Sequence, residues 1–321
     1  MMLLIIYVLL GIAGLIFFEL QAADASANIN FSPQVHTISK VFLVKGSVSQ
    51  SSVDVNSATI PVKTPTLSKT SSQSGTTSQV CFFGLCQQTV TTDDVNRISG
   101  QLKSSLDAQI ASQIQQQLQK QGAVQVGSTE FTTPSSPTSD SPVGTQSKTV
   151  TVTMTEQGQF AYFLRSDAQS VARSLLNREV EKLGANYALF SPLTQIGQPV
   201  VTNIDSNTGI VSISIAAGGD AVYHFSSAEL QAIPNALKNI KLKDAISRLQ
   251  QRPGVDPTTV SIHLSSGDTM PGDIRQIKII PINATNLPPV QLTPISASPT
   301  PTISTTPTSD VTPTPTATSG N

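Results

Sequence analysis

The stretch VTTDDVNRISGQLKSSLDAQIASQIQQQLQKQG, residues 90–122, decides the fold of the chain around it. Apolar residues recur in it at intervals of three or four, which predicts one helix over residues 92–122 with a single apolar face. That face consists of Val95, Ile98, Leu102, Leu106, Ile110, Ile114 and Leu118. The residues Thr92–Asp94 suit the start of a helix, and Gly122 suits its end. We expect the face to pack on its own domain; a surface for a partner helix is the alternative.

Residues 35–91, which precede this helix, predict a small β-rich domain. Short apolar runs alternate there with polar, turn-rich stretches such as Ser68–Ser78. Cys81 and Cys86 are the only cysteines of the chain, and Gly84 between them supplies a turn. We expect a disulfide that closes the tip of a hairpin. Two free thiols and a metal site are the alternatives, although no histidine lies nearby in the sequence.

The region after the helix predicts a second, mixed domain. Residues 123–147 are expected to form a strand and loop connection, and residues 148–282 an α+β domain. The order strand–helix–strand–strand occurs twice in it, which suggests tandem units over 148–216 and 217–282. The expected strands are Lys148–Met154, Val200–Ile204, Ile210–Ile215, Val222–Phe225, Val260–Leu264 and Ile274–Ile282, the last two paired, and the expected helices begin at Ser166, Ser226 and Leu242. Helices on one face of mostly antiparallel strands would bury both patterns, so we expect an α+β fold.

The N-terminus, MMLLIIYVLLGIAGLIFF, is an uncharged apolar block over Met1–Phe18. As a helix it would span about 27 Å, close to the thickness of the bilayer core. We therefore expect a transmembrane anchor over residues 1–20, with the lipid bilayer as partner of Met1–Leu20, followed by a linker over 21–34. A signal peptide cleaved at Ala25-Ser26-Ala27 is the alternative. The expected location is the cell membrane, single-pass, with the C-terminal bulk extracytoplasmic.

Composition sets further bounds. The chain has 19 basic and 20 acidic residues and a net charge of −1, so no basic surplus exists to neutralise phosphates, and no nucleic-acid partner is expected. Residues 283–321 are rich in Pro, Thr and Ser, with Asp310 as their one charge. Such a stretch cannot bury enough apolar surface to offset its ordering entropy, which predicts a disordered tail.

No catalytic motif is found in the sequence. The three histidines, His36, His224 and His263, have no ligand-spaced neighbours, and we expect satisfied or surface-facing side chains. Asp93-Asp94 could bind a cation but is better explained as a helix start. The run Asp205–Asn207 is like a fragment of a calcium loop, but it lacks the glutamate at the twelfth position, so we expect a hairpin turn. No catalytic, cofactor-binding or metal-binding residue is therefore predicted, and we expect no enzyme.

The C-terminal half carries the features of a known family. Leu242–Leu249 is followed by Pro253-Gly254-Val255, the strand Val260–Ile262, Met270-Pro271 and a last strand Ile274–Ile280. With the helix at 92–122, this order resembles the extracellular half of bacterial baseplate J-like proteins, over roughly residues 35–282. The resemblance rests on structural signatures, so it implies a fold more than a function.

Three functions remain open from the sequence. The first is a membrane-anchored structural or interaction protein of the bacterial cell envelope without catalysis. The second, from the family resemblance, is a component of a phage-tail-like apparatus. The third is an enzyme or glycan-binding module acting on the envelope, although the chain has no Trp and only four Tyr to form a sugar platform.

Overall fold

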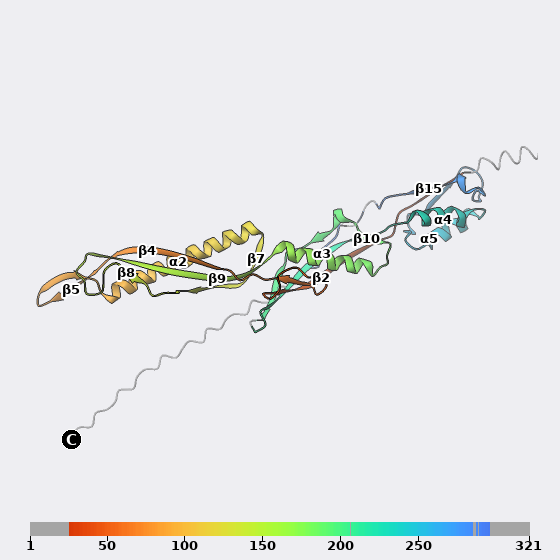
Figure 1. Ribbon diagram of the computed structural model, residues 1–321. Helices are drawn as coiled ribbons and strands as arrows, with labels where there is room; N and C mark the ends of the chain where they lie inside the picture. Colours follow the sequence, from red (N-terminus) through yellow and green to blue (C-terminus); the bar gives the residue numbers. More distant parts are fainter. Residues whose placement is uncertain (1–25, 206, 285–286, 288, 296–321) are drawn as a thin grey trace, which may run out of the picture.

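The computed structural model describes residues 26–205, 207–284, 287 and 289–295. The predicted anchor over Met1–Leu20 and most of the predicted tail lie outside these residues. Figure 1 shows an elongated molecule made of three bodies in a row. We call them the proximal body (residues 26–34 and 224–284), the middle body (35–62 and 165–223) and the distal body (63–164).

The distal body is a helix on a sheet. The helix α2, Thr92–Gln121, packs on the antiparallel strands β4 (Thr66–Thr76), β9 (Thr149–Leu164) and β7 (Ala123–Thr132), in the order β4-β9-β7, with β8 (Thr138–Ser139) also paired to β9. Six of the seven predicted apolar positions of α2 are buried and Val95 is half-buried, so the predicted helix and its packing on its own domain are confirmed. Gly122 ends the helix in the left-handed conformation with φ of 61°. The N-cap is Thr91, one residue before the predicted start.

A separate hairpin lies at the far end of the distal body, beyond the start of α2 (Figure 1). It consists of β5 (Ser78–Phe82) and β6 (Leu85–Thr89), which pair only with each other as a two-stranded sheet. The hairpin therefore projects from the body instead of extending its sheet.

The middle body is built on two long strands. β2 (Val35–Ser47) and β13 (Ile210–Tyr223) pair antiparallel from Val35↔Val222 to Ser47↔Ile210. The sheet is completed by β3 (Thr59–Pro61), β10 (Tyr187–Leu189), β11 (Gln195–Ile196) and β12 (Val200–Asp205). The helix α3, Arg165–Glu181, covers one face of it, and a 3₁₀ turn, η1, spans Ser191–Leu193. Apolar side chains of α3, β2 and β13 form the largest core cluster of the described residues.

The proximal body contains the start of the described chain. The last described residues, 289–295, lie on the middle body, where the Ser39 hydroxyl donates to the carbonyl of Gln291 at 2.7 Å and Val290 is buried, so the predicted disordered tail does not begin at residue 283. β1 (Ala27–Phe31) lies between β14 (Ser261–Leu264, antiparallel) and β15 (Ile277–Pro281, parallel). The helices α4 (Ser227–Leu237) and α5 (Leu242–Gln250) pack nearby, and a 3₁₀ turn, η2, covers Ile274–Gln276. The prediction of a linker over 21–34 misses β1. The predicted pairing of the last two strands with each other is also wrong, because β1 separates them.

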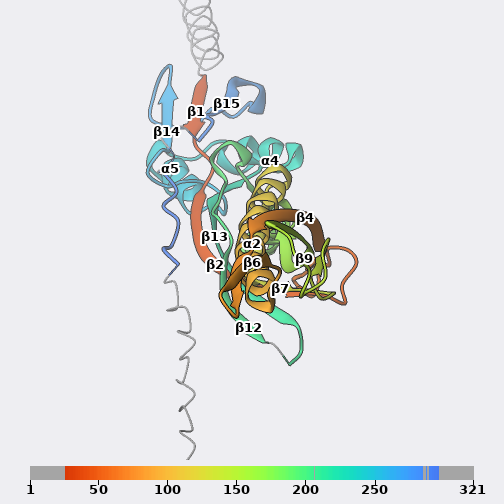
Figure 2. The same cartoon turned by 90° about the vertical axis from the view of Figure 1, so that its left-hand side faces the viewer.

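The path of the chain is nested. It leaves the proximal body through β1 and β2, builds the distal body as one continuous insertion, and returns through α3 and β13. Figure 2 looks along the molecule from its distal end and shows β1, β14 and β15 beyond the distal body. The middle of the sequence therefore lies at one end of the molecule, and residue 26, which follows the apolar N-terminal block, lies at the other.

The predicted fold class is wrong. Strands make up 42% of the described residues and helices 27%, which is a β-rich fold and not the predicted α+β class. The polar strands account for the error, because β4 has the sequence TLSKTSSQSGT and gives no apolar signal. β13 also continues across residue 216, which was the predicted boundary between the two tandem units. None of the helices within the described ranges is both long and apolar enough to cross a bilayer.

Candidate functional site

The hairpin β5–β6 is closed by a disulfide between Cys81 and Cys86, as the sequence predicted. Within the described residues neither cysteine is a free thiol or part of a metal-binding group. Phe83 and Gly84 form the two-residue turn, with φ of 50° and 80°. Positive φ at both central residues is what a type I′ turn requires. We call residues 81–86 the tip.

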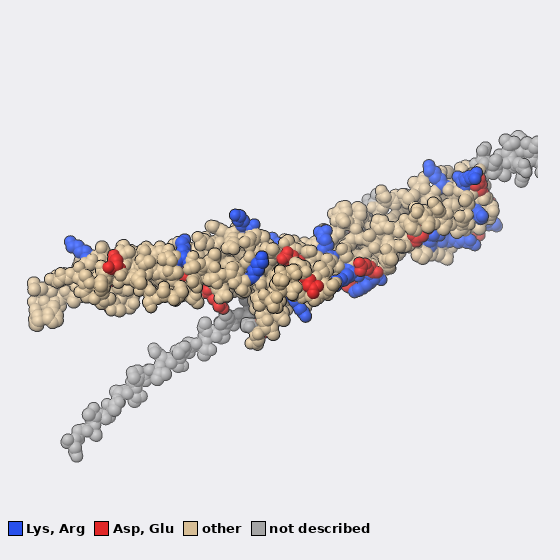
Figure 3. Space-filling view, in the orientation of Figure 1, with Lys and Arg blue, Asp and Glu red and all other residues tan. Residues whose placement is uncertain are grey.

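The tip exposes large apolar side chains. Phe82 is 72% exposed, Phe83 94% and Leu85 74%. The rings of Phe82 and Phe83 contact each other edge to face, with centroids 4.7 Å apart. No residue between Thr70 and Thr92 is charged, and Figure 3 shows the far end of the distal body without Lys, Arg, Asp or Glu. An exposed apolar cluster of this kind on a monomer commonly marks an interaction site.

The apex residue is held in an unfavourable backbone conformation. Asn or Asp normally occupies the first position of such a turn, since a bulky L-residue at positive φ costs about 1 kcal/mol or more. Phe83 adopts this conformation although its ring is almost fully exposed and contacts the ring of Phe82 edge to face. Strained positions cluster at functional sites, so the choice of Phe over Asn favours a role for this ring outside the folded chain.

Asp94 fixes the hairpin to the distal body. Its buried carboxylate accepts hydrogen bonds from the backbone N–H (2.9 Å) and hydroxyl (2.8 Å) of Ser78, where β5 begins, and from the N–H (3.1 Å) and hydroxyl (2.7 Å) of Thr91, the N-cap of α2. Burial raises the pKa of this carboxyl, but the four hydrogen bonds outweigh burial and hold the pKa well below its usual range. The sequence identified the helix start but not the contact with Ser78, which is 16 residues away.

A second buried carboxylate ties the middle of α2 to the sheet. Glu156 of β9 is fully buried and pairs with Lys103 of α2 at 2.7 Å, while the Thr133 hydroxyl donates to it at 2.6 Å. The hydrogen bond to Glu156 raises the pKa of the Lys103 ammonium, against a smaller effect of burial. Each charge has its partner, so this pair reads as a structural element of the distal body.

The other candidate residues from the sequence are not brought together into a site. His36 lies in β2, His224 follows β13, and His263 lies in β14. Asp205 accepts hydrogen bonds from Asn207 and Thr208, which confirms a hairpin turn between β12 and β13; Ser206 lies outside the described residues. Across the part of the chain that the structure describes, no three His, Cys, Asp or Glu side chains are placed to hold a metal ion.

One buried carboxylate is only half satisfied. Asp220 of β13 is inaccessible to solvent, and its Oδ1 accepts from the Thr37 hydroxyl at 2.5 Å. Its Oδ2 has no hydrogen-bond partner within the residues that the structure describes. No second ionisable side chain is paired with it there, so it offers no acid–base pair.

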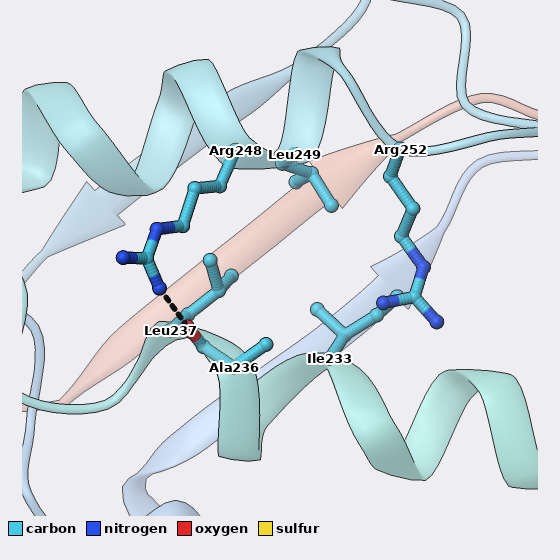
Figure 4. A pocket seen from close by; sticks show the side chains of 6 residues that line it. All are labelled: Ile233, Ala236, Leu237, Arg248, Leu249 and Arg252. Carbon is cyan, nitrogen blue, oxygen red and sulfur yellow. Dashed lines mark hydrogen bonds between the residues drawn. The ribbon is translucent and has the colours of Figure 1, made fainter.

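The proximal body contains a small apolar pocket of about 180 Å³ between α4 and α5. Figure 4 shows the apolar side chains of the two helices facing each other, with Arg248 and Arg252 at either side. Arg248 donates to the carbonyl of Ala236 at 3.2 Å, and Arg252 donates to the carbonyl of Glu229 at 3.1 Å. Both guanidinium groups thus brace the two helices, which favours a role in packing.

Comparison of the chain with known protein families, with characterised proteins and with solved structures found no match. Within the described residues, the tip is the strongest candidate site.

Proposed function

We propose that this chain is an extracytoplasmic structural or interaction protein of the bacterial cell envelope, attached to the membrane by its apolar N-terminal block, that holds the tip away from that membrane without catalysis. The observation that carries the proposal is the position of the tip, at the opposite end of the molecule from β1, the first described strand (Figures 1 and 2). Only seven residues separate residue 26 from the end of the block at Phe18.

The disulfide supports the proposed compartment. Disulfides persist in extracytoplasmic environments and are rare where the cell keeps thiols reduced. Cys81 and Cys86 lie at the exposed tip, where reductants have direct access. A lasting bridge at this position is consistent with an oxidising surrounding.

Membership of the baseplate J-like family is part of the proposal. The C-terminal run of residues that carries most of the resemblance, from Leu242 to Ile280, lies in the proximal body and includes a position with a clear physical role. Gly254 has a φ of 81°, and a Cβ on it would lie 2.3 Å from the Tyr223 ring. Only glycine fits this position, which accounts for the Pro253-Gly254-Val255 signature.

The test is the cellular location of the full chain and the side on which the tip lies. We expect the protein in the membrane fraction after a high-salt wash, with its N-terminus intact. A thiol reagent that does not cross membranes should label Cys81 and Cys86 in whole cells only after a reductant that is equally impermeant. Recovery of the protein from the soluble fraction with an N-terminus at Asn28, or labelling only after lysis, would contradict the proposal.

A further inference from the structure

We propose that the tip inserts end-on into the interface of a lipid bilayer facing the membrane that holds the N-terminus. This inference rests on the proposed function for the attachment and orientation of the molecule. It adds the chemistry of the partner, which the fold alone does not identify.

The polarity of the hairpin changes along its length and not from one face to the other. Phe82 and Leu85 are cross-strand partners on one face, and the Cys81–Cys86 disulfide lies on the other. From Cys81 to Cys86 no side chain carries a hydroxyl, amide or charge. Further inward, Val80 is the last apolar residue, and Gln79, Gln87 and Gln88 form an uncharged polar collar around it.

A planar membrane interface and a protein groove require different arrangements of apolar and polar side chains on the hairpin. A groove is matched by one apolar face and one polar face, as in most interface patches, which bury one side of an element. A bilayer surface changes from polar to apolar along its normal, which matches an apolar end below a polar collar. The three strand residues from Val80 to Phe82 rise about 10 Å, comparable to the depth that interfacial segments reach.

The backbone of the tip can tolerate this depth. β5 and β6 are paired along Ser78–Phe82 and Leu85–Thr89, so the inward-facing backbone groups have partners. The insertion stays at the interface, where water and headgroups can satisfy the remaining groups, and does not reach the bilayer centre.

The absence of charge specifies the kind of bilayer. Basic clusters are what draw proteins to anionic lipids, and none exists between Thr70 and Thr92. The tip should therefore bind zwitterionic lipid by apolar contact, with little dependence on salt.

The experiment uses the full chain reconstituted in donor vesicles and protein-free acceptor vesicles of phosphatidylcholine carrying a second dye. Resistance of the protein to alkaline extraction from the donor vesicles reports attachment. Retention of the acceptor dye on immobilised donor vesicles reports insertion of the tip. We expect acceptor capture by the wild type and at least a tenfold loss for each of Phe82→Ser, Phe83→Ser and Leu85→Ser. The control Leu43→Ser removes an equally large side chain that is 56% exposed in β2, and it should capture acceptors like the wild type.

Each result separates the two proposals. Firm attachment without acceptor capture overturns the inference and leaves the proposed function standing. If donor vesicles cluster with one another in the absence of acceptors, and the tip variants abolish this clustering, the inference is overturned and the partner of the tip is a second copy of the chain. Capture that requires phosphatidylserine and disappears in high salt also overturns it. If alkaline extraction removes the protein from the donor vesicles, the proposed function fails. The inference about the tip is then tested separately, by comparing how much of the unattached wild-type chain and of Phe83→Ser floats with acceptor vesicles.

Discussion

The attachment of the hairpin to the distal body depends on one carboxylate, and Asp94→Asn tests it. Asp94 accepts two hydrogen bonds from backbone N–H groups and two from hydroxyls, and a fifth, at 3.4 Å, comes from the guanidinium of Arg97. Asparagine keeps one acceptor oxygen and turns a donating amide toward the remaining donors. The hydroxyls of Ser78 and Thr91 can rotate to accept from that amide, but the backbone N–H groups cannot.

The expected cost follows from these contacts. A hydrogen bond to a charged group contributes about 1.5–3 kcal/mol, whereas the N-cap bond from the backbone N–H of residue 94 to the Thr91 hydroxyl is kept in the variant. With partial rescue by the hydroxyls, we expect Asp94→Asn to lower the free energy of opening of this region by about 2–4 kcal/mol. The matched control is Asp93→Asn, an exposed neighbour in the same helical turn, which should lose only about 0.3–1 kcal/mol of helix-dipole stabilisation.

Hydrogen exchange of the full chain, resolved by peptides over residues 78–94, measures this effect. Asp94→Asn should accelerate exchange there by about 30-fold or more, whereas Asp93→Asn should change it by less than about tenfold. Equal effects of the two variants would refute the anchoring role.

The pH dependence gives a second check on Asp94. Because its pKa is lowered in the folded protein, its stabilising contribution is present above the unfolded pKa of about 3.9 and is lost as the pH falls below that value. The difference in urea stability between wild type and Asp94→Asn should therefore shrink at about pH 3 and below. A difference that stays constant down to that pH would contradict the assignment.

Lys103→Met should destabilise the distal body by about 2–4 kcal/mol in urea, since it leaves the Glu156 carboxylate buried without its partner, and adding Glu156→Gln should recover part of the loss. Because the pKa of Lys103 is raised, this contribution should persist to about pH 10 and be lost only as the pH rises through the folded pKa. Replacing both Cys81 and Cys86 by Ser should cost about 2 kcal/mol for so short a loop, visible as faster amide exchange in the hairpin alone. Phe31→Ala should lower the stability of the proximal body by about 3–5 kcal/mol by denaturation, because the ring is fully buried; a linker residue would tolerate the change.

The sequence was sufficient to predict the elements whose pattern lies within one continuous stretch of the chain. The helix over 92–122 and its apolar face could be predicted because its periodicity is carried by the helix itself. The disulfide hairpin could be predicted because both cysteines and the turn glycine lie within six residues.

The rest depends on partners far away in the sequence. β1 is five residues long, and its place between β14 and β15 is set by chain segments more than 200 residues distant. β4 pairs along its whole length with β9 although its residues are mostly Ser and Thr, so its order comes from ladder hydrogen bonds and cross-strand hydroxyl pairs such as Thr70 with Thr155. β4 leaves no apolar pattern to read, and β1 has only the short alternation of Ala27, Ile29 and Phe31.

The candidate site could be predicted from the sequence only in part, because its position also depends on contacts between distant segments. The sequence indicated a hairpin tip but not that it stands alone at the far end of the molecule. That property follows from the nesting of the bodies, which in turn requires β1 and β2 to lead the chain outward and β13 to bring it back.

The central claim is that the tip and the N-terminal attachment lie at opposite ends of the molecule. The 30 residues of α2 and the 14 residues of β13 rise about 45 Å each along the molecule, so the two ends should be roughly 100 Å apart. A globule of this chain length would be only about 50 Å across.

Energy transfer to acceptor lipids in proteoliposomes of the full chain tests this claim directly, with Phe83→Ser in both proteins so that the tip does not bind a neighbouring vesicle. One donor dye is placed on Lys278→Cys in β15, and in a second protein on Val143→Cys beside the hairpin base, where the N–H of Gly144 donates to the carbonyl of Val90. We predict strong transfer from position 278 and almost none from position 143. Equal transfer from the two positions would contradict the account.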